Sequence, residues 1–245
     1  MDSPLIVVPA FNEQATIEGV VTSLRNLNYE VLVVDDCSSD ATAERAARSG
    51  AYVLHLSVNL GVGGALRAGF RFATGMGYST VVQVDGDGQH PGDQVADLLK
   101  ALHHFDAHLV IGSRYLLDSS TFLTSRFRRF AMWCLSGVAS QLARTRITDS
   151  TSGFRAIRQP LLSEFAREFP NYYLGDTFES TVAAARAGYN VIEIPASITH
   201  RAFGKSSIGS FRAVQLIAKV LVVSIALLQV RIRPFGQHLS KVNPD

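Results

Sequence analysis

The stretch Thr80-Val81-Val82-Gln83-Val84-Asp85-Gly86-Asp87-Gly88-Gln89-His90-Pro91 decides the fold of this chain. An apolar run that stops at two carboxylates, one residue apart, predicts a buried strand with acidic side chains beyond its C-terminal end. Asp85 and Asp87 repel each other unless a cation lies between them, and oxygen ligands suit Mg²⁺ or Mn²⁺. A solvated acidic turn is the alternative, and this stretch alone does not decide between the two.

Short apolar runs alternate with amphipathic runs on both sides of that stretch. The alternation predicts an α/β fold, in which helices cover both faces of a mostly parallel central sheet. Strands are expected at residues 5–8, 31–34, 52–56, 81–84 and 109–112, and helices at 15–27, 41–49, 62–74 and from 91 to about 104.

The loops after these five strands are polar or rich in glycine. Ligands of such sheets bind beyond the carboxyl ends of the strands. We therefore expect the five loops to converge on one rim and to form one site. They are residues 9–13, 35–36, 59–64, 85–87 and 112–114.

The second half of the chain is less regular. Apolar residues recur at helical spacing over residues 127–144, and residues 164–169 suggest a further helix. Residues 153–157 and 191–198 are β-like. No internal repeat or low-complexity linker is present, so a single domain is expected.

Composition narrows the class of protein. The 245 residues suffice for one large domain, and 47% hydrophobic with 18% charged residues excludes a disordered chain. A net charge of +2 is too small to indicate a nucleic-acid partner. Cys37 and Cys134 form neither a metal-binding spacing nor a redox pair, which is typical of a reducing compartment. The N-terminal residues have no signal-peptide pattern.

Four motifs, in order, resemble those of family 2 glycosyltransferases with the GT-A fold. They are Pro9-Ala10-Phe11-Asn12-Glu13, Val34–Thr42, Asn59–Ala65 and Asp85–Pro91. Further motifs resemble the polyprenyl-phosphate sugar transferase branch, which includes the dolichol-phosphate mannosyltransferases. These are Gly112-Ser113-Arg114, Asp149–Arg155, Glu193-Ile194-Pro195 and Arg201–Ser206. The resemblance implies a GT-A domain over residues 1–207, with a nucleotide-sugar-binding half at 1–115 and an acceptor half at 116–207.

The resemblance implies a nucleotide-diphosphate sugar as donor, either a UDP-sugar or a GDP-sugar. Pro9, Phe11 and Glu13 would form the walls around base and ribose, and Asp36 would accept hydrogen bonds from them. For Phe11 a packed core aromatic is the alternative, and for Asp36 a structural role in helix capping.

The glycine-rich loop opens a helix, so the free N–H groups of Gly61 and Gly63 would face phosphate. Arg67, one turn into that helix, would add positive charge there, or is a solvated surface residue.

The metal and sugar are expected at the acidic turn. Asp85 would contact the ribose or the metal with its water shell, and Asp87 would ligate Mg²⁺ or Mn²⁺ on the diphosphate. Gln89 would contact the sugar or the metal shell. The cation would neutralise the leaving nucleoside diphosphate, which makes Asp87 a catalytic candidate.

The acceptor decides whether a base is needed. A hydroxyl must lose a proton, whereas a polyprenyl phosphate is already anionic and needs cations to hold it. Arg114, Arg128 and Arg201 fit that need, because guanidinium binds phosphate with a two-pronged fork. Asp149 is a further site candidate, and for a hydroxyl acceptor it would be the base.

Two departures from the polyprenyl-phosphate branch concern the acceptor. Ser207 stands where the branch usually has a lysine, and Met132 stands where a hydroxyl residue is expected. The Q-x-x-R-W type signature of processive synthases is absent, which argues against polymer extension.

The end of the chain suggests contact with a membrane. Eighteen residues lie between Arg212 and Arg231 with one charge, Lys219, and would span about 27 Å as a helix. Because polar residues recur along one face, we expect residues 208–245 to lie in the membrane interface as an amphipathic helix and tail. A helix packed on the protein's own sheet, or on a dimer partner in a homo-oligomer, is the alternative.

These observations lead to one hypothesis with two rivals. The chain would be a metal-dependent inverting glycosyltransferase that moves a sugar to a polyprenyl or dolichyl phosphate, peripheral at the cytoplasmic face of the cell membrane. The first rival has a glycan or small-molecule hydroxyl as acceptor. The second is a membrane-associated protein that binds nucleotide sugars without turnover.

Overall fold

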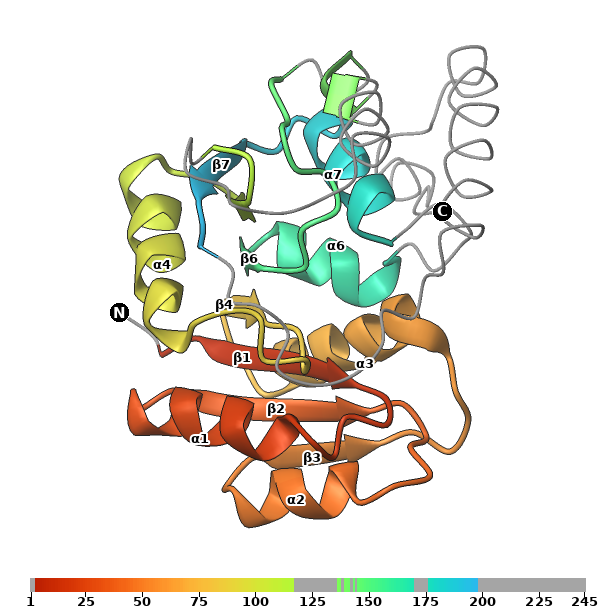
Figure 1. Ribbon diagram of the computed structural model, residues 1–245. Coiled ribbons are helices and arrows are strands. Elements are labelled where there is room, and N and C mark those ends of the chain that lie inside the picture. Colours follow the sequence, from red (N-terminus) through yellow and green to blue (C-terminus); the bar gives the residue numbers. More distant parts are fainter. Residues whose placement is uncertain are drawn as a thin grey trace, which may run out of the picture.

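The computed structural model describes residues 3–116, 136–137, 139–141, 143, 145–169 and 176–197. A seven-stranded sheet runs through this part of the chain, in the order β3-β2-β1-β4-β6-β5-β7 (Figure 1). The strands are β1 (Leu5–Ala10), β2 (Glu30–Asp35), β3 (Tyr52–His55), β4 (Thr80–Gln83), β5 (Leu109–Ser113), β6 (Arg155–Arg158) and β7 (Val191–Pro195).

The helices predicted for the first half are confirmed, with ends that differ by a few residues. The largest difference is at Pro91, which has an extended backbone with ψ at 128° and precedes a 3₁₀ turn, so that the α-helix starts at Val95. The helices are α1 (Ile17–Asn26), α2 (Thr42–Arg48), α3 (Gly61–Gly75), η1 (Gly92–Gln94), α4 (Val95–His104), α6 (Leu161–Arg167) and α7 (Asp176–Arg186).

The mostly parallel sheet is also confirmed, with one exception at β6. Parallel pairs join β1 to β2 and β4, β2 to β3, and β5 to β7. β6 is antiparallel to both of its neighbours, β4 and β5. A strand from the second half of the chain therefore lies between two strands of the first half, and the two halves share one sheet.

The second half differs from the sequence expectation mainly in element ends. The predicted strand at 153–157 begins at Arg155, and the one at 191–198 ends at Pro195. The helix expected at 164–169 begins at Leu161, directly after Pro160, because proline suits the start of a helix. Most of the helix expected at 127–144 lies outside the described residues.

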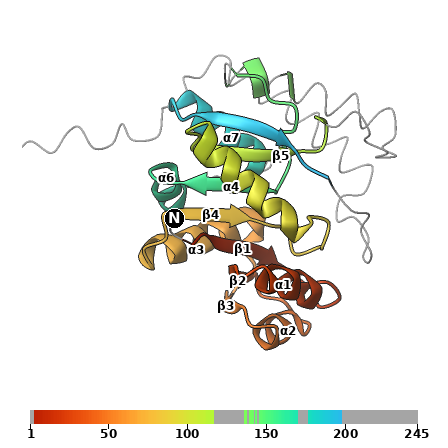
Figure 2. The same cartoon turned by 90° about the vertical axis from the view of Figure 1, so that its left-hand side faces the viewer.

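Both faces of the central strand are buried, as expected for a parallel strand between two helical layers. In β1, Ile6 and Val8 face a core shared with α1, α2 and α4. Leu5 and Val7 face the other core, which α3 and α6 cover. Figure 2 shows α3 and α6 on one side of the sheet and α1 on the other.

One glycine sets the distance between α3 and the sheet. A Cβ added at Gly69 would lie 2.6 Å from Cγ1 of Val7, closer than packed atoms allow. The absence of that atom lets α3 approach β1, and so it fixes where the N-terminus of α3 lies at the rim.

Candidate active site

The loops after β1 to β5 meet at one edge of the sheet, as predicted. The strands β1 to β4 run in the same direction, and β5 is parallel to β4 because both are antiparallel to β6. The N–H of Leu60 donates to Oδ1 of Asp36 at 2.7 Å, and the hydroxyl of Thr16 donates to the carbonyl of Gly86 at 2.8 Å. Hydrogen bonds thus connect loops that are far apart in the sequence into one rim.

Asn12 joins the loops after β1 and β2, a role that the sequence analysis missed. Its N–H donates to Oγ of Ser38, and its Oδ1 accepts from the N–H of Ser39, both at 2.9 Å. The φ of Asn12 is +55°, a left-handed conformation that asparagine tolerates better than most residues. The available signal was an asparagine inside the first motif, followed later by a cluster of hydroxyl residues in the second.

Asp85 and Asp87 lie in the turn after β4. The N–H of Gln89 donates to Oδ1 of Asp87 at 3.1 Å, which holds the turn closed. Oδ2 of Asp85 lies 3.4 Å from Nε2 of His90. A Cβ added at Gly153 would lie 2.5 Å from both carboxylate oxygens of Asp85. The carboxylate of Asp85 therefore packs directly on the backbone of the segment that precedes β6.

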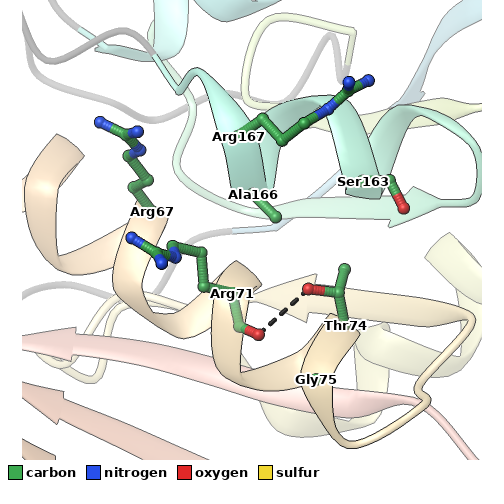
Figure 3. A pocket seen from close by; sticks show the side chains of 7 residues that line it. All are labelled: Arg67, Arg71, Thr74, Gly75, Ser163, Ala166 and Arg167. Carbon is green, nitrogen blue, oxygen red and sulfur yellow. Dashed lines mark hydrogen bonds between the residues drawn. The ribbon is translucent and has the colours of Figure 1, made fainter.

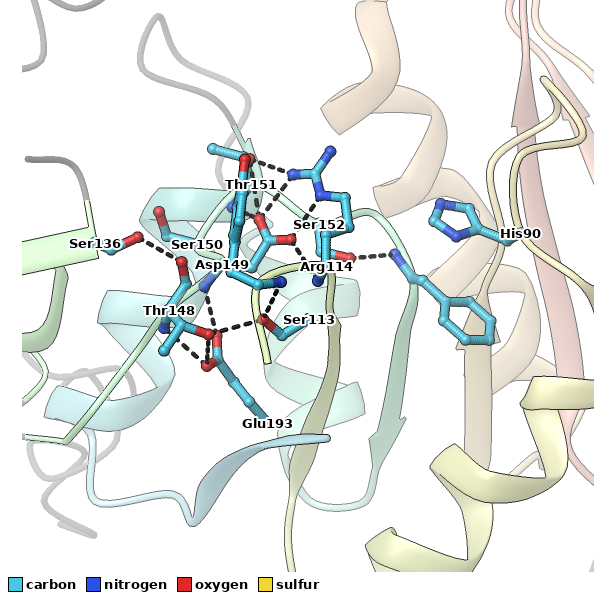
Figure 4. A network of polar contacts seen from close by, with 12 residues as sticks. His90, Ser113, Arg114, Ser136, Thr148, Asp149, Ser150, Thr151, Ser152 and Glu193 are labelled. Carbon is cyan, nitrogen blue, oxygen red and sulfur yellow. Dashed lines mark hydrogen bonds and ion pairs between the residues drawn. The ribbon is translucent and has the colours of Figure 1, made fainter. Parts of the chain in front are cut away.

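His90 lies behind this carboxylate, and its role was not predicted. Its side chain is 5% exposed, and the ring stacks on Phe154 with the centroids 5.0 Å apart (Figure 4). Burial alone would raise the pKa of Asp85, but the hydrogen bond with His90 and the charges of Arg114 and Arg155 lower that pKa below its ordinary value. Asp85 is consequently a carboxylate at neutral pH.

The two carboxylates fit a hard divalent cation. Within the described residues, no third His, Cys, Asp or Glu joins them in a group that could hold a metal. Mg²⁺ commonly takes one or two carboxylates and completes its shell with water and substrate phosphate oxygens. The pair is thus suited to a cation that arrives with a diphosphate, and not to a closed all-protein cage.

The residues predicted to contact base and ribose differ in accessibility. Phe11 is 49% exposed, so the alternative of a packed core aromatic is wrong. Pro9 is buried within β1, where its side chain shapes the strand end and does not form an open wall. Glu13 is partly buried, and its Oε2 accepts from the hydroxyl of Thr16 at 3.1 Å.

Asp36 holds the loop after β3 in place. Besides the bond from Leu60, its backbone carbonyl accepts from Nδ2 of Asn59 at 3.2 Å. The N–H of Gly61 in turn donates to Oδ1 of Asn59 at 3.2 Å, and Gly63 is buried in the first turn of α3. Asp36 therefore has a structural role at the start of α3, and among the described residues its Oδ2 accepts no hydrogen bond.

Arg114 and Asp149 form a bidentate ion pair at the site. Nε of Arg114 donates to Oδ2 of Asp149 at 2.6 Å, and Nη2 donates to Oδ1 at 2.7 Å and to Thr151 Oγ1 at 2.7 Å (Figure 4). Burial would raise the pKa of Asp149, but the hydrogen bonds and charge of Arg114 lower it. Within the described residues the two N–H groups of Nη1 have no partner, so this edge of the guanidinium is open to a ligand.

Glu193 anchors the segment that carries Asp149, and its role was missed although its motif was quoted. Its carboxylate accepts from the N–H groups of Thr148 and Asp149, both at 2.8 Å, and from the Thr148 hydroxyl at 2.6 Å. That hydroxyl also lies 2.7 Å from Oγ of Ser113 (Figure 4). The end of β5, the segment before β6 and β7 are thereby joined in one network.

Several sequence predictions fall on parts of the chain that the structure does not describe. Arg128, Arg201, Met132, Ser207 and the helix and tail at 208–245 all lie outside the described residues. Among the described helices, none combines the length and apolar character needed to cross a membrane.

The sequence matches a known protein family and several relatives. The model of the family "Glycosyl transferase family 2" matches residues 5–165, which include the rim from β1 through Asp149. Undecaprenyl-phosphate mannosyltransferase from Micrococcus luteus is 34% identical, over 82% of this chain and 86% of that protein. Polyprenol monophosphomannose synthase from Mycolicibacterium smegmatis is 29% identical, over 88% of this chain and 84% of that protein.

Solved structures agree with the fold. Glucosyl-3-phosphoglycerate synthase from Mycobacterium tuberculosis, in complex with Mn²⁺, UDP and phosphoglyceric acid, superimposes with a TM-score of 0.64. The sequence identity is 26%, and the match covers 91% of this chain and 78% of that one. A complex of the same enzyme with Mg²⁺ and UDP gives a TM-score of 0.61 at 26% identity, over 90% of this chain and 78% of that one.

Proposed function

Because the chain belongs to glycosyl transferase family 2, we propose that it moves a sugar from a nucleotide-diphosphate sugar to a polyprenyl phosphate, with inversion at C1 of the sugar. The two relatives named above support this acceptor. One name specifies mannose transfer to undecaprenyl phosphate, and the other specifies synthesis of a polyprenol monophosphomannose. The chain covers more than four fifths of each of these proteins.

The proposal rests on the burial and the ionisation of Asp149. A transferase to a hydroxyl needs a base with a free oxygen near the acceptor. Asp149 is fully buried, is held ionised by Arg114, and accepts the N–H of Arg114 as well as its guanidinium. A carboxylate in this setting is a weak base, but it positions a cation well, and a cation is what an anionic acceptor requires.

The proposed roles of the side chains follow from their places on the rim. Phe11, Glu13 and Asp36 receive the nucleoside, and the N-terminal turn of α3 faces phosphate. A divalent cation on Asp85 and Asp87 would neutralise charge on the leaving nucleoside diphosphate.

Arg114 orients the acceptor phosphate with the two N–H groups of Nη1, which neither Asp149 nor Thr151 uses. An oxygen of that phosphate attacks C1 of the sugar, the bond from C1 to the nucleoside diphosphate breaks, and no proton has to be removed. The contact of Asp85 with Gly153 brings the donor turn and the Arg114–Asp149 pair into one site.

The acceptor lipid places the enzyme at a membrane. We propose peripheral attachment at the cytoplasmic face through the amphipathic segment at 208–245, with Arg128 and Arg201 as further cations for the acceptor. The division into a donor half at 1–115 and an acceptor half at 116–207 and the homo-oligomer are likewise proposals.

Product analysis tests the acceptor. The protein is incubated with radiolabelled UDP-sugars and GDP-sugars and Mn²⁺, with and without undecaprenyl phosphate, and the organic phase is chromatographed. A labelled lipid that forms only with undecaprenyl phosphate is expected. Nucleotide release without any lipid-linked sugar would contradict the proposed acceptor while leaving the transferase assignment intact.

A small-molecule acceptor is the second candidate, because the solved structures that match include a complex with phosphoglyceric acid. That compound also carries a phosphate, to which Nη1 of Arg114 could donate in the same way. Adding 3-phosphoglycerate in place of the lipid separates the two: a labelled water-soluble product would favour this candidate.

A further inference from the structure

A pocket of about 610 Å³ lies between α3 and α6, away from the rim. Arg67 and Arg71 line it from α3, and Arg167 lines it from α6 (Figure 3). Helix α3 begins at the rim with Gly61, and Arg67 lies six residues further on, roughly 9 Å along the helix axis. The sequence analysis predicted that Arg67 adds charge near the donor phosphates or is a solvated surface residue. In the structure it is partly buried and lines this pocket.

Arg67 and Arg71 form an uncompensated pair of charges. Four residues apart on α3, they project from successive turns on the same side of the helix (Figure 3). Like charges at this spacing repel each other. Within the described residues neither guanidinium makes an ion pair, and Nε of Arg67 is buried with no hydrogen-bond partner. A buried donor of this kind normally has a partner, which indicates that an acceptor binds here.

The other polar groups of the pocket do not supply that acceptor. Arg167 forms an ion pair with Glu164, so its charge is compensated, unlike the charges of Arg67 and Arg71. The hydroxyl of Ser163 donates to Oε1 of Gln159 at 2.6 Å. Within the described residues, the pocket therefore has two guanidinium groups, those of Arg67 and Arg71, that pair with no carboxylate.

We propose that Arg67 and Arg71 form a second anion site, which binds a phosphate group on the α3–α6 face of the protein. Guanidinium offers paired N–H donors in a plane, which match two oxygens of a phosphate monoester or diester. Such a group comes either from a free phosphate compound or from the head group of an anionic membrane lipid. The site is independent of the donor and acceptor assignments made above.

The test compares two double variants that lose the same charge. Arg67→Gln/Arg71→Gln removes the proposed site. The control, Arg48→Gln/Lys100→Gln, removes two exposed cations from α2 and α4, which cover the other face of the sheet. Each protein is titrated calorimetrically with inorganic phosphate in EDTA, and is floated with vesicles of phosphatidylcholine with or without phosphatidylglycerol. Nucleotide release from the donor is followed in parallel and is expected to stay unchanged in both variants.

The two arms identify the source of the phosphate. A free compound is indicated if wild type and control bind inorganic phosphate and the Arg67/Arg71 variant does not. A lipid head group is indicated if only that variant binds phosphatidylglycerol vesicles more weakly, by about 30-fold for two arginines near a membrane surface. An Arg67→Lys/Arg71→Lys variant should recover part of either signal, because it keeps the charge and loses the fork. Equal behaviour of the two double variants in both arms overturns the proposal, whatever happens to donor turnover.

Discussion

Arg114 donates two parallel hydrogen bonds to Asp149, from Nε to Oδ2 at 2.6 Å and from Nη2 to Oδ1 at 2.7 Å. The side chain of Asp149 is fully buried, while the side chain of Arg114 is 21% exposed. The pair is thus asymmetric: Asp149 is the anchor, and Arg114 is the group that can still reach a ligand. Two motifs that suggested separate functional residues therefore form one unit.

Asp149→Asn should reduce both stability and transfer. It leaves Arg114 partly buried without its counter-charge, and loss of one partner of a buried pair costs about 3 kcal/mol in the free energy of unfolding. Urea denaturation measures this. Donor hydrolysis without acceptor should fall less than transfer to undecaprenyl phosphate, and an equal fall of both would contradict the proposed role of Arg114 toward the acceptor.

The same pair predicts how stability depends on pH. Because the pKa of Asp149 is lowered in the folded protein, its contribution is present above the ordinary Asp pKa and is lost as the pH falls through the folded-state value. Wild type should therefore lose stability faster than Asp149→Asn between about pH 5 and pH 2. Parallel curves for the two proteins across this range would show that the pair does not stabilise the fold.

Gly153→Ala should disable the donor turn. The new Cβ would lie 2.5 Å from both oxygens of Asp85, so the carboxylate must move. We expect nucleotide release with Mn²⁺ to fall by on the order of 10²-fold. Gly137→Ala is the matched control, because no atom lies within 4 Å of its added Cβ. Similar activity in the two variants would mean that the position of Asp85 is not critical.

Asp87→Asn should separate a catalyst from a binding protein. If Asp87 holds the cation on the diphosphate, nucleotide release should fall by about 10²–10³-fold, and excess Mn²⁺ should restore little of it. The unfolding free energy should change little, because Asp87 lies in a turn and is only partly buried. Release at the wild-type rate would remove Asp87 from the metal site.

Phe11→Ala should weaken donor binding without unfolding the protein. A stacked base contributes about 1–3 kcal/mol, so KM for the nucleotide sugar should rise about tenfold with kcat nearly unchanged. Phe11 is 49% exposed, and its removal leaves no core cavity. Met76→Ala, at an apolar side chain that is 65% exposed and follows the last turn of α3, is the control for loss of a surface apolar group. A fall in melting temperature specific to Phe11→Ala would indicate a packing role.

The rim formed by the loops after β1 to β5 could be predicted from the sequence because it depends on local pattern. Strands that alternate with helices along the chain form a parallel sheet. The carboxyl ends of parallel strands lie at one edge of the sheet, so the five loops that follow them meet there. The sequence pattern therefore predicts one rim for Phe11, Asp36, Asp85 and Asp87, and in the structure all four lie at the ends of strands on that rim. The burial of each side chain was not predictable, because the burial of Pro9 and the exposure of Phe11 depend on how neighbouring loops pack.

The surroundings of Asp85 and Asp149 could be predicted only in part because their contacts join distant segments. The insertion of β6 between β4 and β5 brings Gly153 against Asp85, and β7 brings Glu193 against the backbone of Thr148 and Asp149. Nothing in the spacing of those residues specifies which strand pairs with which, or in which direction.

The amino-acid sequence by itself determined the fold class, the family resemblance and the acidic turn after β4, because each of these depends on short-range patterns of apolar and polar residues. The tertiary structure alone decided that Asp149 pairs with Arg114, that His90 and Gly153 support Asp85, and that Arg67 and Arg71 share a pocket away from the rim. Hydrogen bonds and charge pairs act over only a few ångströms, so their partners are fixed by strand order and helix packing and not by distance along the chain.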